Sequence, residues 1–240
     1  MSHDQTTEIA ANLQNVRARI AEAAHRSGRE AKDVTLIAVT KTFPVAAIMA
    51  AWQAGQRHFG ENRPEEGGRK IPQVMREITA ERLPTISPSL AGGEAADQSG
   101  GSPGVPVWHM IGHVQSRKTD LVLKHFDIVH SIDRLRIARR LSVFGEETGH
   151  DLPVLLECNV SGEESKYGYD AAGWENDADL RAALLVEINE VVALPNLHVC
   201  GLMTVAPIVD DPEAARPVFV SLRALRDFLQ DEVPSVDWHH

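Results

Sequence analysis

The sequence has few of the features that build disulfide frameworks, metal knuckles or membrane spans. Its two cysteines, Cys158 and Cys200, form no CxxC motif, so neither a disulfide framework nor a zinc knuckle is expected. No apolar run approaches the roughly 20 residues that a membrane-spanning helix needs. The N-terminus lacks the basic-then-apolar order of a secretion signal. These absences favour a cytoplasmic protein without a membrane partner.

Basic residues are fewer than acidic residues in this chain. The chain has 24 Lys and Arg against 34 Asp and Glu, which gives a formal charge of −10. Proteins that bind nucleic acid or anionic lipid usually present a basic face. We therefore expect no nucleic-acid partner.

The remaining composition is that of a globular protein. Of 240 residues, 43% are hydrophobic, which is enough to bury a sizeable core. Barrels made of strand–helix units run near this length as one domain. We expect residues 1–240 to form a single domain.

Short apolar runs and amphipathic segments alternate along the chain. An amphipathic helix over residues 9–24 comes first, and six strand–helix pairs follow it. The predicted strands are 34–39, 57–60, 105–111, 126–130, 152–158 and 197–202, and the helices that follow them are 45–54, 64–77, 114–124, 133–147, 177–192 and 212–229. Strict alternation predicts parallel strands with right-handed crossovers. Without a GxGxxG turn, an open doubly wound sheet and a closed (β/α)8 barrel both agree with this pattern.

One segment interrupts the alternation. Between Pro84 and Pro106, 13 of 23 residues are Pro, Gly or Ser. Such a composition buries too little surface to offset the entropy lost on ordering. We predict that residues 84–106 are a flexible surface insertion, on the face opposite the strand ends that carry barrel chemistry.

Lys41 is the first candidate functional residue. It follows the apolar run that ends at Val39, a run whose β-branched residues predict a strand buried on both faces. Alternation places Lys41 on the same face as Ile37 and Val39, at a strand end of the kind that lines a barrel mouth. Such a lysine can act as an amine nucleophile. Alternatively, its stem lies on apolar surface and its charge lies in water.

Asn62 and Met203 stand at two other predicted strand ends. The amide of Asn62 can hydrogen-bond a ligand, or it can cap the helix that begins near Pro64. Gly60 before it allows close approach to the backbone. Met203 ends the last predicted strand, where a thioether can face the mouth or pack in the core.

Two further segments are weaker candidates. His109 and His113 are four residues apart, a spacing that chelates zinc on a helix, but their segment reads as a strand running into a glycine turn. No third ligand stands out, so a metal site is not expected. Residues 161–168 do not match a phosphate-binding GxxxxGK[ST] loop and read as a solvated loop.

Taken in order, these segments resemble the YggS/PROSC-type pyridoxal phosphate homeostasis proteins. The matching stretches are Leu36–Thr42, Phe59–Asn62, Trp108–Gly112, Gln115–Lys118, His130–Arg134 and Gly201–Thr204. The loop at residues 161–168 also resembles the family's Glu-x-x-Lys-x-Gly loop, with Lys166 and Gly168 at the matching positions. The matches keep their order from about Ile9 to Asp237.

The resemblance implies a (β/α)8 TIM barrel of the alanine racemase N-terminal-domain type. It implies a pyridoxal 5′-phosphate cofactor held as a Schiff base on Lys41, with Asn62 and Met203 beside it. It also implies a carrier of pyridoxal phosphate without established turnover, not an enzyme. The expected partners are apo-enzymes that depend on this cofactor, and the expected state is a monomer or weak dimer.

The resemblance has one departure. Family members continue with a Ser-x-Gly-Met-Ser strand end and an Arg-Ile-Gly-Thr turn, which together hold the phosphate. This chain ends at Val236–His240, where a seventh strand is expected to begin. We therefore expect a barrel whose last strands are missing and a weakened hold on phosphate, because such sites usually come from the last two strands.

Two rival functions stay open on the sequence. A racemase or decarboxylase that uses pyridoxal phosphate shares the lysine, but related enzymes add a second, β-rich domain. A metal-dependent hydrolase needs acidic or histidine ligands at several strand ends. The predicted strand ends offer Lys41, Asn62, Ser131, Asn159 and Met203, a poor set for a metal.

Overall fold

The computed structural model describes residues 3–82, 104–149 and 151–240. Most of the predicted insertion at 84–106 lies outside these residues. The chain forms two compact units, of which the first contains Met1–Glu61 and Glu65–His109 and the second contains Asn62–Pro64 and Met110–His240. The expectation of a single domain stays a prediction, and the units are described in turn.

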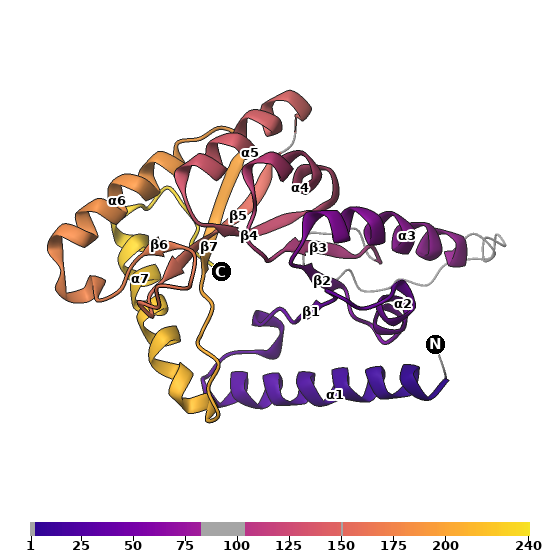
Figure 1. Cartoon of the computed structure of the whole chain (residues 1–240). Coiled ribbons are helices and arrows are strands. Elements are labelled where there is room, and N and C mark those ends of the chain that lie inside the picture. The colour runs from indigo at the N-terminus through magenta and orange to yellow at the C-terminus, as the bar shows by residue number, and fades with distance from the viewer. Residues whose placement is uncertain (1–2, 83–103, 150) are drawn as a thin grey trace, which may run out of the picture. The chain divides into compact units, whose positions relative to one another are not determined.

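The first unit pairs parallel strands with helices (Figure 1). Its elements are α1 (His3–Arg26), a 3-10 turn (Ala31–Asp33), β1 (Ile37–Val39), α2 (Val45–Gln53), β2 (His58–Glu61), α3 (Pro64–Arg82) and β3 (Val107–Met110). β1 and β2 are parallel, with Ala38 opposite Phe59. β3 follows β2 in the sheet, and the Val107 N–H donates to the Arg57 carbonyl at 2.8 Å.

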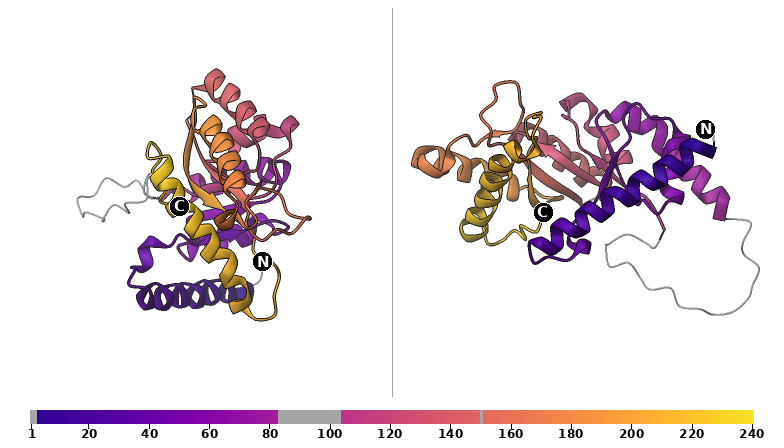
Figure 2. Two further views of the ribbon diagram at one scale, coloured as in Figure 1. Left: turned by 90° about the vertical axis from the view of Figure 1, so that its left-hand side faces the viewer. Right: turned by 90° about the horizontal axis from the view of Figure 1, so that it is seen from below.

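The helix boundaries follow local chemistry. α2 begins at Val45, as predicted, and Pro44 occupies its N-cap, where the fixed φ of proline suits the start of a helix. The helix ends at Gln53, and Gly55 beyond it has a φ of 82°, which glycine adopts without strain. α1, drawn in indigo in Figure 2, packs along α2.

The second unit repeats the same alternation. Its elements are a 3-10 turn (Ser116–Lys118), α4 (Thr119–His125), β4 (Ile128–Ile132), α5 (Leu135–Thr148), β5 (Leu152–Asn159), β6 (Tyr169–Asp170), a 3-10 turn (Trp174–Asn176), α6 (Ala178–Val192), β7 (Leu197–Met203), a 3-10 turn (Pro212–Ala215) and α7 (Arg216–Glu232). β5 pairs in parallel with β4, β6 and β7. α5 lies against β4, and α6 and α7 lie against β7 (Figure 1). The predicted α/β class with parallel strands is confirmed, and the sequence missed only the two-residue strand β6 among the described strands.

β5 forms the centre of the second core. Val154 and Leu156 on this strand are fully buried, as are Ile188 of α6 and Leu225 of α7. A parallel strand covered on both faces reads as an almost continuous apolar run, which is how the sequence identified it.

β1 does not match its prediction. We expected a strand buried on both faces, but Val39 is 43% exposed, and Ile37 and Ala38 are only half-buried. Among the described strands, β1 pairs only with β2, so its other edge carries no strand. An apolar composition thus predicted the strand correctly and its burial wrongly.

The last residues pair with β7. The His240 N–H donates to the Cys200 carbonyl at 3.1 Å, and the Leu202 N–H donates to the His240 carbonyl at 3.2 Å. This is the hydrogen-bond pattern of parallel strands. A Cβ on Gly201 would lie 2.1 Å from the His240 oxygen, so only glycine fits there.

None of the described helices is both long enough and apolar enough to cross a bilayer.

The core of the second unit gives a first test of the fold. Leu141 on α5 is fully buried, whereas Val143 on the same helix is 54% exposed. Leu141→Ala should lower the free energy of unfolding by about 2–5 kcal/mol, because it leaves a cavity. Val143→Ala should change it by no more than about 0.5 kcal/mol. Urea denaturation of both variants checks this, and equal losses would contradict the described packing of α5.

Candidate functional site

Lys41 lies in a tight turn between β1 and α2. The Phe43 N–H donates to the Thr40 carbonyl at 3.1 Å, which closes a four-residue turn with Lys41 and Thr42 at its centre. Val39 and Lys41 are exposed and Thr40 between them is buried, as period-two alternation requires. Within the described residues, the Lys41 amine forms no hydrogen bond or ion pair.

Thr42 gives this turn an unusual backbone. Its φ is 66°, in the left-handed region. Glycine or asparagine normally occupies such a position, and a β-branched residue there is an outlier. The strain of such a residue is on the order of 1–3 kcal/mol. Contacts outside the turn must therefore hold it in place.

Two side chains of α3 supply those contacts. The Thr42 N–H donates to Oε1 of Glu66 at 2.6 Å. Nζ of Lys70 donates to the Thr40 carbonyl at 2.7 Å. The backbone on each side of Lys41 is thus bound to one helix.

Lys70 itself is saturated. Its Nζ also donates to Oε1 of Glu61 at 3.0 Å and to Oε1 of Glu66 at 2.5 Å. Glu61 is fully buried, and its Oε1 additionally accepts from the Thr40 hydroxyl at 2.7 Å. An ammonium has three protons. All three of Lys70 are therefore engaged, in contrast to those of Lys41.

Asn62 belongs to the second unit, where it lies against Gly112. A Cβ on Gly112 would lie 2.2 Å from the Asn62 carbonyl oxygen, so a side chain at 112 would displace Asn62. Oδ1 of Asn62 is buried and accepts no hydrogen bond from any described residue. Asn62 therefore does not cap α3 through this atom, and the helix-cap alternative is wrong. A buried carbonyl oxygen without a donor suits a ligand that donates one.

Met203 ends β7, also in the second unit. It is half-buried, and the strand register places it opposite Glu157 of β5. No hydrogen bond joins Asn62 and Met203 within the described part of the chain. The structure thus places Lys41 in the first unit and Asn62 and Met203 in the second. Asn62 directly follows β2, and Met203 ends β7.

Acidic and histidine side chains meet near the ends of β4 and β5. Nη1 of Arg134 donates to Oδ2 of Asp133 at 2.7 Å, and Nδ1 of His113 lies 3.0 Å from the same oxygen. Burial raises the pKa of Asp133, and the charges of Arg134 and His113 oppose that shift. Burial raises the pKa of Glu157 to about 7, with a further contribution from Asp133. A carboxyl group of this kind can release or take up a proton near neutral pH.

The sequence missed these acidic residues. Glu61 and Glu157 interrupt apolar strands, where a charge is costly unless it is paired or protonated. That interruption was the available signal. Glu66 and Lys70 are four residues apart on a helix, a spacing that predicts an ion pair. Nothing in the sequence indicated that this pair would hold the turn around Lys41.

The two histidines singled out by spacing have separate partners. Nε2 of His109 lies 2.9 Å from Nδ1 of His58 in the first unit. His113 stacks on Tyr167 in the second, with 4.0 Å between ring centroids. Among the described residues, no group of three acidic, histidine or cysteine side chains could hold a metal ion.

The loop at 161–168 forms several contacts of its own. Lys166 forms an ion pair with Glu163 and is only 15% exposed. Oδ1 of Asn159 accepts hydrogen bonds from the Ser161 hydroxyl at 3.0 Å and from the Gly162 N–H at 3.1 Å. Tyr167 also stacks on His113 and is 56% exposed. The segment is thus a loop with several exposed residues, as expected, and the sequence did not predict its internal contacts.

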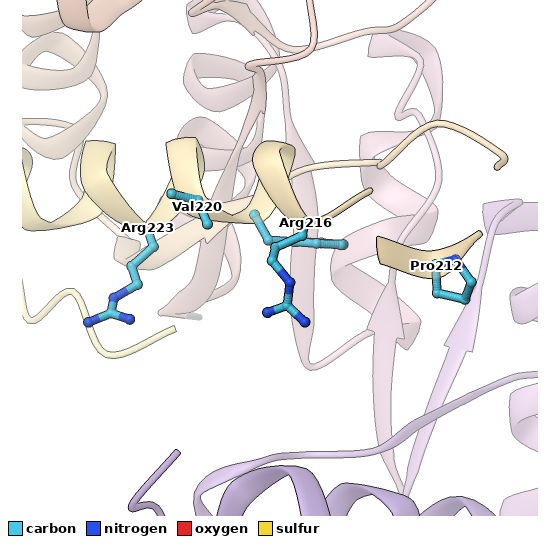
Figure 3. Close-up of a pocket in the computed structure, with 5 residues that line it drawn as sticks. Pro212, Arg216, Val220 and Arg223 are labelled. Carbon is cyan, nitrogen blue, oxygen red and sulfur yellow. The ribbon is translucent and has the colours of Figure 1, made fainter. Parts of the chain in front are cut away.

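A surface pocket lies along α7, and none of the predicted site residues lines it. In Figure 3, Arg216 and Arg223 extend to the same side of the helix. The pocket is also lined by Pro212, Phe219 and Val220. None of these residues was singled out by the sequence.

Comparison with known proteins identifies relatives along almost the whole chain. Residues 11–240 match the family model of the alanine racemase N-terminal domain. The pyridoxal phosphate homeostasis protein of Vibrio cholerae is 37% identical over 229 residues, which cover 95% of this chain and 83% of that protein.

Solved structures give the same result for the fold. An unknown protein from Bifidobacterium adolescentis is 33% identical, with a TM-score of 0.78 over 97% of this chain and 83% of that one. PipY of Synechococcus elongatus, solved with PLP bound, is 29% identical, with a TM-score of 0.63 over 91% of this chain and 85% of that one.

Glu157 generates a prediction about pH. Its pKa is raised from 4.5 to about 7 in the folded chain, so the folded state keeps a proton that the unfolded chain releases. The stability from neutral Glu157 is complete below the unfolded pKa and is lost as the pH rises through the folded pKa. Glutamine cannot ionise. The gain in unfolding free energy of Glu157→Gln over the wild type should therefore grow from about pH 5 to about pH 8.

Urea denaturation across this range measures that gain. Glu146→Gln, at an exposed position of α5, is the control and should show no such trend. A gain that stays constant or shrinks with rising pH would contradict the burial of a protonated Glu157.

Proposed function

Because the chain belongs to the family of the pyridoxal phosphate homeostasis proteins, within the alanine racemase N-terminal-domain fold, we propose that it binds pyridoxal 5′-phosphate covalently through Nζ of Lys41. In this proposal the protein holds the cofactor in reserve and passes it to apo-enzymes that need it. When bound, the cofactor supplies an aldehyde that condenses reversibly with a primary amine, with loss of water.

The observation that carries this proposal is the contrast between two lysines. Condensation needs an approachable amine that can lose a proton. Lys41 is exposed and has no hydrogen-bond partner among the described residues. All three protons of Lys70 are engaged by acceptors, two of which are carboxylates. The amine of Lys41 is therefore accessible to a ligand, whereas the amine of Lys70 is held by three hydrogen bonds.

Asn62 and Met203 fit supporting roles. The buried Oδ1 of Asn62 accepts no hydrogen bond from a described residue and would accept one from a ring hydroxyl. The half-buried thioether of Met203 would give the ring an apolar contact. These two residues would orient the ring.

An amino-acid racemase or decarboxylase is the second candidate. It is favoured by one observation, the pKa of Glu157 near 7, because a group that titrates there can transfer protons. Incubation of the protein with L-alanine and cofactor in D₂O separates the two functions. With a carrier, the α-proton signal of alanine should decay only as fast as it does with free cofactor. With a racemase, the signal should decay faster.

Trapping the bound cofactor tests the role of Lys41. Borohydride reduction of the protein with pyridoxal phosphate, followed by peptide mapping, should place the label on Lys41. The label should disappear in Lys41→Arg, because the guanidinium cannot lose its proton. Lys118→Arg is the matched control and should label like the wild type. Dominant labelling of Lys118 or Lys166 would refute the assignment.

A further inference from the structure

The turn that carries Lys41 is bound on both sides by one ion pair. Lys70 donates to the carbonyl before Lys41, that of Thr40, at 2.7 Å. Glu66 accepts from the N–H after it, that of Thr42, at 2.6 Å. The same two side chains bond to each other at 2.5 Å. No surface pair far from the turn could act on both of its peptide groups at once.

Burial makes this arrangement rigid. The side chains of Lys70 and Glu66 are only 14% and 16% exposed. Glu61, which is fully buried, binds the same Nζ and the Thr40 hydroxyl. Charged groups with little access to water keep their partners, because separation would leave a buried charge unpaired.

The strain at Thr42 explains why such a hold is needed. A threonine with a φ of 66° would relax to a right-handed or extended conformation if nothing restrained it. That rotation would redirect the peptide next to Lys41 and, with it, the base of the Lys41 side chain. Residues in sparsely populated backbone regions persist only where their surroundings fix them.

We propose that Lys70 and Glu66 are positioning residues that hold the Thr40–Phe43 turn and thereby present the amine of Lys41 to its ligand. The inference rests on the proposed function of Lys41. It adds that Lys70 does not react with the ligand because its three protons are engaged in the contacts that hold the turn of Lys41. Lys70 and Glu66 act through the backbone and touch no ligand themselves.

The experiment compares variants of the pair with a matched control. Lys70→Met and Glu66→Ala remove the two contacts. Arg17→Met is the control, because Arg17 also binds a backbone carbonyl of the first unit, that of Ala54 at 3.0 Å, away from this turn. Labelling of Lys41 by pyridoxal phosphate with cyanoborohydride should slow roughly tenfold in the first two variants, the effect of losing one charge-assisted hydrogen bond. Arg17→Met should label at the wild-type rate.

A second readout needs no cofactor. The Thr42 N–H should be protected from hydrogen exchange in the wild type and should exchange faster in Lys70→Met and Glu66→Ala. Glu66→Gln should keep most of this protection, since its amide oxygen still accepts from Thr42. Thermal unfolding of each variant identifies any that fail to fold.

Thr42→Gly provides the rescue. Glycine adopts a positive φ without strain, so this change in the Glu66→Ala background should restore most of the Lys41 labelling rate. If Glu66 only stabilised the fold, Thr42→Gly would not restore the labelling rate of Lys41. Equal labelling of Lys41 in Lys70→Met and Arg17→Met, or no recovery with Thr42→Gly, would overturn the inference.

Failure of the proposed function gives a different result. In that case the wild type takes the label elsewhere than Lys41. Two measurements then test the inference without the cofactor. They are the rate of hydrogen exchange at the Thr42 N–H and the rate at which acetic anhydride acetylates Lys41. Unchanged values of both in Lys70→Met would overturn it, and loss of protection with slower acetylation would support it.

Discussion

Parallel strand pairing is the constraint on which the rest of the structure depends. Because each connection returns the chain to the same end of its sheet, the residues that follow successive strands within a unit come to the same edge. In the first unit this brings the turn after β1 next to the end of β2, so that Thr40 reaches Glu61. In the second unit the same rule brings Asp133 after β4 close enough to Glu157 of β5 to shift its pKa.

The charged side chains near these strand ends lie in three different environments. Lys70 is partly buried and is held by two carboxylates, which fixes its position and occupies its protons. Lys41 is exposed and has no such partner among the described residues. Within the described residues, the structure therefore separates a lysine whose three protons are engaged from a lysine whose amine is exposed and has no partner. Glu157 follows a third course, in which burial favours the neutral acid.

Much of this was predictable from sequence, because the signals are local. Apolar runs and amphipathic spacing located the strands and helices, including the start of α2 at Val45. Lys41 was singled out by its place after an apolar run and by the family resemblance, and its role stays a prediction. Burial was less predictable, since it depends on neighbours far along the chain. β1 has the composition of an inner strand, yet Val39 is exposed. Two further features could not be predicted for the same reason. They are the hydrogen bond from Lys70 to the turn and the buried Oδ1 of Asn62 that accepts no hydrogen bond from a described residue, and both depend on how separate elements pack.

The central claim is that Lys41 carries the cofactor. A crystal structure of the chain soaked with pyridoxal phosphate tests it most directly. The account predicts continuous electron density from Nζ of Lys41 to the cofactor ring. Continuous density from a different lysine, or a cofactor bound with Nζ of Lys41 free, would contradict it.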